Sequence, residues 1–190
     1  MPINLSKGQK VDLTKTNPGL KKVIVGLGWD VNAFDSGADF DLDAAAFMVD
    51  ASGKCPTEKD FIFYGNLDSQ DGSVHHTGDN LTGEGDGDDE QIVIDLTRVP
   101  AEYDKIVIVV NIYDAVRKNQ HFGMIRNAFV RLVDSKNNSE LMKYNLTDDY
   151  SGMTAIIFGE VYRHNGEWKF AAVGQGTKDP GLGELASRYR

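Results

Sequence analysis

The sequence predicts an all-β fold, a β-sandwich of about nine strands with one or two short helices. Apolar residues either alternate with polar ones or form short runs bounded by Gly, Asn, Asp and Pro, and both patterns are strand signals. Turn residues recur at short intervals, as in sandwiches and barrels. Strands and helices do not alternate along the chain, which argues against a doubly wound α/β fold.

The first half of the chain contains four predicted strands. Residues 23–29 and 61–64 are largely apolar runs. Residues 41–49 begin with alternating Asp and apolar residues, and residues 91–96 alternate more completely. Because successive side chains of a strand point to opposite faces, alternation is expected to turn one face of each segment toward a core.

The second half adds five strands, and it also contains the few helical candidates. Residues 105–113 form a nearly continuous apolar run, which is typical of a buried central strand. Further strands are predicted at residues 129–133, 141–146, 154–162 and 168–173. Short helical segments are expected only at residues 124–128 and 182–189.

Length and composition are consistent with one domain over residues 1–190. The chain is 41% hydrophobic and has no linker or tandem repeat, so it can build a core without disulfides. Cys55 is its one cysteine, which rules out a disulfide within the chain and is interpreted as a loop thiol. No apolar run approaches the roughly 20 residues of a membrane helix, and the first residues lack a secretion signal. A reducing cytoplasm is the expected location.

The negative charge is concentrated in one third of the sequence. The whole chain has a formal net charge of −9. Residues 30–90 hold 16 acidic and two basic residues, a net of −14, and the remainder holds 13 acidic and 18 basic residues, a net of +5. Such a field attracts cations and repels nucleic acid and anionic lipid, so neither nucleic-acid binding nor membrane insertion is predicted.

The strongest motif is the acidic, glycine-rich segment 78–90. Six carboxylates and three glycines lie between Asp79 and Glu90, with no basic residue among them. Glycine lets the backbone curl and turn carbonyl oxygens inward beside the carboxylates. Calcium takes six to eight oxygen ligands in flexible geometry, which a loop of this composition can supply. Without a cation, the crowded carboxylates would repel one another.

Three other segments are expected to complete a metal site at one end of the sandwich. Asp39, Asp41 and Asp43 are two residues apart and would share one strand face, with Phe40 and Leu42 facing the core. The polar turn from Asn66 through Asp68 to Asp71 adds oxygen donors, and Asp30 follows Trp29. One or two calcium ions are predicted, with this ligand set: Asp30, Asp39, Asp41, Asp43, Asn66, Asp71, Asp79, Asn80, Asp86, Asp88, Asp89 and Glu90.

Alternatives to this calcium site follow from the same residues. A charge run is most often a solvated turn, and an Asp row can be a half-exposed strand face. A helix–loop–helix calcium site does not fit, because Ala44 stands where its loop requires glycine. Zinc is disfavoured by the lone cysteine, and magnesium ranks behind calcium because it keeps several waters.

Several motifs resemble the tellurium-resistance TerD family of stress proteins, and the resemblance covers nearly the full chain. They are Val25-Gly26-Leu27-Gly28-Trp29-Asp30, Asp39-Phe40-Asp41-Leu42-Asp43-Ala44, Gly78-Asp79-Asn80, Thr82-Gly83-Glu84-Gly85-Asp86-Gly87-Asp88-Asp89-Glu90, Phe122-Gly123, Gly159-Glu160-Val161-Tyr162-Arg163 and Trp168-Lys169-Phe170. The resemblance implies a bacterial or phage-like calcium-binding β-sandwich with a role in resistance to tellurite and other chemical stress. It also implies other stress-resistance proteins as partners, in an assembly peripheral to the inner membrane. The acids of the 39–43 and 79–90 segments take metal-site roles by this resemblance.

Three functions compete on the sequence. The leading hypothesis is a non-enzymatic, calcium-ordered scaffold for protein interactions. The alternative is a metal-assisted phosphoesterase-type hydrolase, against which the chain offers no nucleophile–base pair and no catalytic residue. Sequestration of a toxic oxyanion is opposed by the negative charge and by the lone Cys55. His75 and His76 are neighbours that would face opposite sides of a strand, so they cannot act as one catalytic unit, and a structural or surface role is expected for both. The late basic residues, Arg131 and Arg163 among them, are interpreted as surface groups that favour solubility, with a surface for an acidic partner as the alternative.

Overall fold

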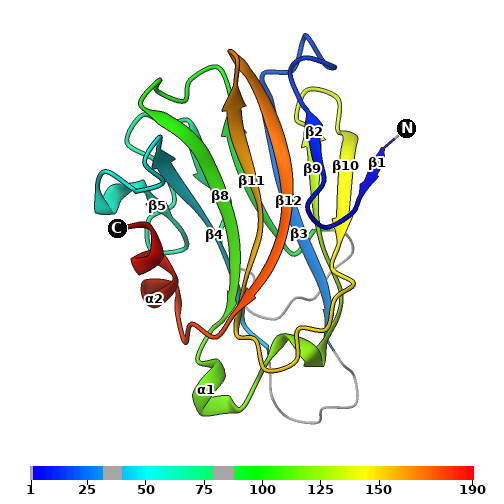
Figure 1. The fold of residues 1–190 in the computed structure, drawn as a ribbon, viewed down its shortest axis with the longest axis vertical. Helices are drawn as coiled ribbons and strands as arrows, with labels where there is room; N and C mark the ends of the chain where they lie inside the picture. The colour runs from blue at the N-terminus through cyan, green and yellow to red at the C-terminus, as the bar shows by residue number, and fades with distance from the viewer. Residues whose placement is uncertain (1, 32–39, 79–87) are drawn as a thin grey trace.

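Two six-stranded sheets pack face to face around one core (Figure 1). This is a computed structural model, and it describes residues 2–31, 40–78 and 88–190. Within those ranges there are twelve strands, so the predicted sandwich is confirmed and the strand count of nine is corrected. All nine predicted strands are present. The additional strands, β1, β2 and β6, are three residues long each, which is too short to show a periodicity.

The first sheet has the strand order β1-β10-β9-β3-β7-β6. Its strands are β1 (Ile3–Leu5), β10 (Ser139–Asn145), β9 (Ile125–Asp134), β3 (Lys22–Val31), β7 (Glu90–Asp95) and β6 (Val74–His76). All its pairs are antiparallel except β1 with β10, which is parallel.

The second sheet has the order β2-β12-β11-β8-β4-β5, and all its pairs are antiparallel. Its strands are β2 (Lys10–Asp12), β12 (Glu167–Thr177), β11 (Ala155–His164), β8 (Tyr103–Ile112), β4 (Leu42–Asp50) and β5 (Phe61–Ile62). The N-terminal residues thus cross from one sheet to the other, because β1 and β2 each extend one edge.

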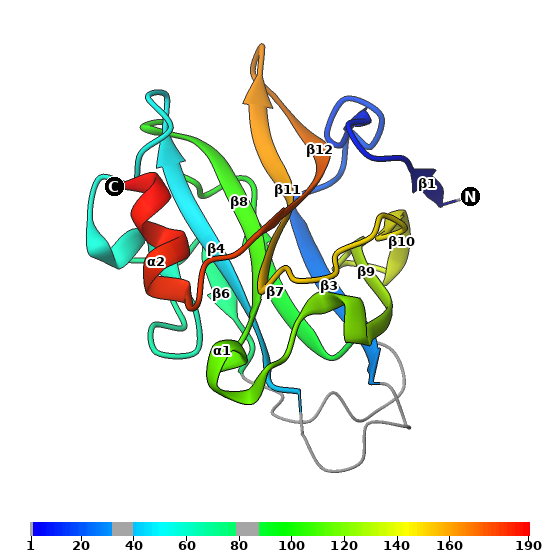
Figure 2. The same cartoon turned by 60° about the horizontal axis from the view of Figure 1, so that its bottom comes forward.

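Strand β4 shows how the sequence divides between two apolar layers. Leu42, Ala44, Ala46 and Met48 belong to the core between the sheets, whereas Ala45, Phe47 and Val49 belong to a second, smaller cluster on the outer face. Because β4 is apolar on both faces, something must cover its outer face. The C-terminal helix α2 (Leu182–Ala186) does so, with Leu185 and Ala186 buried in that cluster (Figure 2).

The short helices lie at the connections between strands. They are α1 (Ala115–Lys118), α2, and the 3₁₀ turns η1 (Glu58–Asp60), η2 (Phe122–Met124) and η3 (Ser187–Tyr189). The helical segment predicted at 182–189 is confirmed, but the one at 124–128 is wrong, because β9 begins at Ile125. Asn127 has φ of 54°, outside the right-handed helical region, and Arg126 and Phe129 on either side of it pair with β3. No helix among the described residues is long and apolar enough to cross a membrane.

Candidate metal centre

Eight of the twelve predicted metal ligands can be placed. Asp39, Asp79, Asn80 and Asp86 lie outside the described residues. The others are Asp30 at the end of β3, Asp41 and Asp43 at the start of β4, Asn66 and Asp71 before β6, and Asp88, Asp89 and Glu90 at the start of β7.

Asp89 and Asp30 are two of these ligands, and their charges act on one another. The Asp89 Oδ2 accepts a hydrogen bond of 2.8 Å from the Trp29 backbone N–H, which lies immediately before Asp30. Burial raises the pKa of Asp89 above its ordinary value; the Trp29 hydrogen bond opposes this, and the negative charges of Asp30 and Asp88 raise the pKa further. Asp30 is exposed, and its Oδ2 accepts a 2.6 Å hydrogen bond from Asn127 Nδ2. A cation between Asp30 and Asp89 would offset their repulsion.

The Asp88 carboxylate forms hydrogen bonds with neighbouring side chains on the outer face of the first sheet. Arg131 Nε donates to its Oδ1 at 2.7 Å, and Arg131 Nη2 donates to its Oδ2 at 3.0 Å. Gln91 Nε2 adds a third hydrogen bond of 3.0 Å to Oδ2. The ion pair with Asp88 raises the pKa of Arg131, which keeps this guanidinium charged. Sequence reasoning missed this role, because it interpreted Arg131 as a surface group.

Glu90 points between the two sheets. Its side chain is fully buried, and Oε2 accepts a 2.7 Å hydrogen bond from the backbone N–H of Ala44. The ring of buried His76 lies on the same oxygen, with Nε2 at 3.5 Å. Strand β5 pairs only with Ala46 and Phe47, so it ends before it reaches Ala44. The Ala44 N–H therefore has no hydrogen-bond acceptor in β5, and the Glu90 carboxylate accepts its hydrogen bond instead.

Asp41 and Asp43 stand at the start of β4, as the alternation predicted, with Phe40 and Leu42 in the core. Asp43 is only 3% exposed and shares the outer face of the second sheet with Phe47. Directly opposite Asp43 on β8 is Asn111, also buried. Asp41 is half-buried, and its carbonyl accepts a 2.7 Å hydrogen bond from the Tyr113 N–H. Asp43 and Asp88 therefore lie on opposite outer faces of the sandwich.

Asn66 and Asp71 are used by the turns that contain them. Asn66 Nδ2 donates to the carbonyl of Phe61 at 2.8 Å, and Asp71 Oδ1 accepts from the Ser73 N–H at 2.8 Å. Side chains of Asn and Asp commonly stabilise turns in this way. His75 and His76, in β6, face opposite sides as expected: His75 pairs with Asp68 at 2.6 Å, and His76 is buried.

The described residues alone do not form a complete cation site. In residues 2–31, 40–78 and 88–190, no group of three His, Cys, Asp or Glu side chains is placed to hold an ion. The pair that fits a hard cation best is Asp30 with Asp89, since both offer oxygen and Asp89 is partly desolvated. Calcium needs more oxygens than this pair provides, and the unplaced predicted ligands belong to the two segments that adjoin it in sequence.

The fold and these residues define a β-sandwich protein with an acidic group at one end of its first sheet. The TerD domain model matches residues 1–189. The chain is 58% identical over 189 residues to general stress protein 16U of Bacillus subtilis (strain 168), covering 100% of this chain and 97% of that protein. It is 56% identical to tellurium resistance protein TerD of Serratia marcescens, with the same coverage. The chain belongs to the TerD family.

A solved structure supports the same fold. The crystal structure of a homologue of telluride resistance protein (TerD) from Streptomyces coelicolor A3(2) superposes with a TM-score of 0.66 at 26% identity. The alignment covers 87% of this chain and 96% of that chain. The family expected from the sequence motifs is therefore confirmed.

Proposed function

We propose that the chain is a calcium-binding protein of the bacterial response to tellurite and other chemical stress, and that it acts as a scaffold rather than as an enzyme. The stress-response part is supported by the family and by the names of the relatives from Bacillus subtilis and Serratia marcescens. In this proposal Asp30 and Asp89 anchor the ion, and acids of the segments 39–41 and 79–86 complete its oxygen shell.

The observation that supports calcium binding is the electrostatics of Asp89. Its carboxylate is partly buried beside the negative charges of Asp30 and Asp88, which together raise its pKa. Asp88 forms an ion pair with Arg131, whereas Asp89 has no hydrogen bond or ion pair with a basic side chain in the described part of the chain. A divalent cation bound there would supply the missing positive charge, and calcium suits all-oxygen ligands.

The scaffold role follows from what such an ion would do. A cation shared by segments 39–41 and 79–86 would link the segment that follows β3 to the segment that precedes β7. The bound ion would change the charge and the shape of the surface at that end of the sandwich, and partner proteins would bind that surface only in the calcium form. The partners proposed are other stress-resistance proteins, in an assembly peripheral to the inner membrane.

The test is a calcium titration by calorimetry on chelator-stripped protein, with thermal melts alongside. At about a hundred times its dissociation constant, calcium should add roughly 2.7 kcal/mol of stability if it binds only the folded state. Asp89→Asn should abolish this gain. In metal-free protein the same substitution should leave the stability unchanged or raise it, because ionising a carboxyl whose folded pKa is raised disfavours the folded state.

The matched control is Glu102→Gln, which removes one negative charge at the opposite end of the sandwich. Tyr103 pairs with Asp50, at the far end of β4 from Ala44, which contacts Glu90. The control variant should therefore bind calcium as the unmodified chain does. Absence of binding heat in the unmodified chain, or equal loss in both variants, would count against the proposed site.

A further inference from the structure

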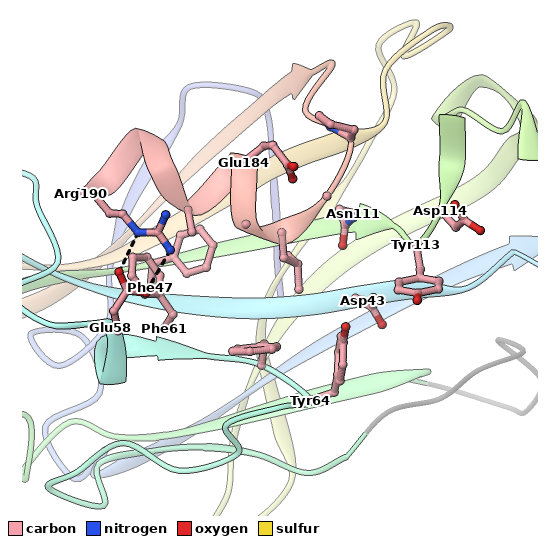
Figure 3. A pocket seen from close by; sticks show the side chains of 16 residues that line it. Asp43, Phe47, Glu58, Phe61, Tyr64, Asn111, Tyr113, Asp114, Glu184 and Arg190 are labelled. Atoms are coloured by element: carbon pink, nitrogen blue, oxygen red, sulfur yellow. Dashed lines mark hydrogen bonds and ion pairs between the residues drawn. The ribbon is translucent and has the colours of Figure 1, made fainter. Parts of the chain in front are cut away.

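A groove lies on the outer face of the second sheet, beside α2 (Figure 3). Its volume is about 460 Å³, within the range of roughly 300–1,000 Å³ typical of ligand sites. The ion pair of Glu58 with Arg190 lies at one end, and Tyr113 lies at the other. Between these ends, Tyr64 and Glu184 stand on opposite walls of the groove.

The lining of this groove is predominantly acidic. Among the described residues, four acidic side chains and one basic side chain line it: Asp43, Glu58, Asp114, Glu184 and Arg190. Glu58 pairs with Arg190, and Asp114 pairs with an arginine outside the lining. Glu184 is exposed, and no hydrogen bond or ion pair joins its side chain to another residue in the described ranges. Its carboxylate is therefore available to a cation from another molecule.

Arg190 shows which chemical group the groove accepts. Its Nε lies 2.9 Å from Glu58 Oε1, and its Nη2 donates to Glu58 Oε2 at 3.0 Å, so both carboxylate oxygens are bound. Its guanidinium carbon lies 5.5 Å from the centroid of the Phe61 ring. A planar guanidinium suits this combination of a carboxylate and an aromatic ring better than an ammonium group does. This end of the groove is therefore an arginine subsite, filled by a residue of the same chain.

The contact that holds Arg190 in this subsite is easily exchanged. The side chains of Arg190 and Glu58 are 47% and 72% exposed. An ion pair as exposed as this one contributes little to stability. An arginine from another molecule can therefore replace Arg190 on Glu58 and Phe61 at small cost, provided that the other molecule makes further contacts in the groove.

Aromatic side chains offer those further contacts. Tyr64 and Tyr113 are both exposed, and aromatic residues of this kind are enriched in protein–protein interfaces. Phe63 packs edge-to-face against Tyr64, with ring centroids 5.2 Å apart. Lys118 Nζ lies 6.0 Å from the centroid of the Tyr113 ring, so a second ring of the lining already attracts a cation of the chain.

We propose that this groove binds a basic segment of a partner protein, in which an arginine replaces Arg190 on Glu58 and Phe61. A neighbouring apolar residue of the segment packs on Tyr64, and a second basic residue pairs with Glu184. A metal ion fits less well, because calcium needs six to eight oxygens and much of this lining is aromatic. The inference goes beyond the proposed function, since it concerns another face of the molecule and requires no bound ion.

The test is calorimetric titration of chelator-treated protein with the blocked tripeptide Arg-Leu-Arg. The charge-reversed tripeptide Glu-Leu-Glu and blocked arginine alone are the comparisons. We expect one Arg-Leu-Arg to bind per chain, and both comparison molecules to bind at least tenfold more weakly. Because no calcium is present, this result is independent of the calcium titration.

A charge reversal at Glu184 tests the second basic contact. Glu184→Arg should weaken binding of Arg-Leu-Arg at least tenfold. Glu102→Arg is the matched control, since Glu102 precedes β8 and does not line the groove. The control variant should bind the tripeptide as the unmodified chain does. Both residues are exposed, so both variants should fold normally.

The arginine subsite has its own test. Arg190→Ala vacates Glu58 and Phe61 and should strengthen binding of Arg-Leu-Arg severalfold. Arg188→Ala removes the same charge from a residue that pairs with Asp179 outside the groove, and should leave the affinity unchanged. Any of three results would overturn the proposal: no binding of Arg-Leu-Arg at millimolar concentration, equal binding of either comparison molecule, or equal affinities of the two arginine variants.

Discussion

The side chain of Asp88 is 1% exposed, and its two oxygens receive three hydrogen bonds from Arg131 and Gln91. Gly26, on the neighbouring strand β3, lies directly beneath the carboxylate, so that a Cβ at this position would overlap Asp88. The glycine is needed here for space, which lets the ion pair lie flat against the sheet. Asp88, which was predicted as a metal ligand, thus stabilises the fold through its ion pair with Arg131, 43 positions later in the sequence.

Gly26→Ala is expected to destabilise the protein by about 1–3 kcal/mol, the usual cost of disrupting hydrogen bonds to a buried charged group. Displacing the Asp88 carboxylate breaks its alignment with the Arg131 guanidinium. Chemical denaturation measures the free energy of unfolding. Gly19→Ala is the matched control, because a Cβ at Gly19 meets no atom within 4 Å. Equal stability of both variants would show that the Asp88 pair can move without cost.

Cys55 is expected to react slowly with thiol reagents. Burial, together with the charges of Asp60, Asp50 and Glu58, raises the pKa of its thiol to about 12, although Arg190 opposes this shift. The thiolate is the reactive form, so at pH 8 modification should be on the order of 10³-fold slower than for a free cysteine. Following the colour of a disulfide reagent, with the denatured chain as reference, measures this. Comparable rates would refute the shielding.

Among the elements, the short strand β5 determines the surroundings of Glu90. Because β5 spans only Phe61–Ile62, the Ala44 N–H is served by the Glu90 carboxylate from the other sheet. This contact joins β7 to β4 across the open end of the sandwich. Glu90 also lies beside Asp89 in the chain, so the same short segment links the core to the proposed calcium site.

Glu90→Ala is expected to lower the free energy of unfolding by about 1–3 kcal/mol, because it leaves the buried Ala44 N–H without its acceptor. Glu90→Gln retains an amide oxygen and should lose less. Denaturant titration of both variants provides the comparison. If glutamine were as damaging as alanine, the negative charge rather than the hydrogen bond would be the stabilising feature, and His76 would be the partner to examine.

At this scale the sequence predicted the long strands well, and the short elements poorly. The apolar run at residues 105–113 and the alternating pattern at residues 91–96 indicate which side chains are buried, and both segments form strands. Strands β1 and β2 depend on partners more than 130 residues away, which local patterns do not contain. The helix expected at 124–128 was wrong because pairing of β9 with β3 outweighs local preference.

The candidate site was predictable in part for the same reason. Alternation correctly separated Asp43 from Phe40 and Leu42, because it depends only on the pleat of β4. The ion pair between Asp88 and Arg131 depends on the register of β3 with its two neighbours, β7 and β9. That register cannot be deduced from the residues near Asp88 in the sequence. Asn111 had a signal that was overlooked: it is the one polar residue in the otherwise apolar run 106–112, and a polar residue at a buried position is unusual.

For the whole molecule, the separation of charge has a measurable effect on stability. Residues 30–90 hold a net charge of −14, which the remaining +5 does not balance. In metal-free protein this self-repulsion should lower stability at low ionic strength. Raising sodium chloride from about 10 mM to 300 mM shortens the screening length and should raise the melting temperature by about 2–4 °C, roughly 1 kcal/mol.

Saturating calcium should reduce this salt effect, because the bound ion already offsets part of the local charge. Melts at both salt concentrations, with and without calcium, provide the comparison in one experiment. A salt response that calcium does not change would place the repulsion outside the proposed metal site, among acids elsewhere in residues 30–90.

The placement of β1 and β2 at the edges of the two sheets has a consequence for synthesis on the ribosome. Ile3 of β1 pairs with Met142 of β10, and Val11 of β2 pairs with Phe170 of β12. At about 5–20 residues per second, Phe170 is made roughly 8–30 s after Val11. During that time the first strands have emerged but their partners do not yet exist. The rate of translation, rather than the rate of folding, therefore determines how long β1 and β2 remain unpaired before β10 and β12 are available.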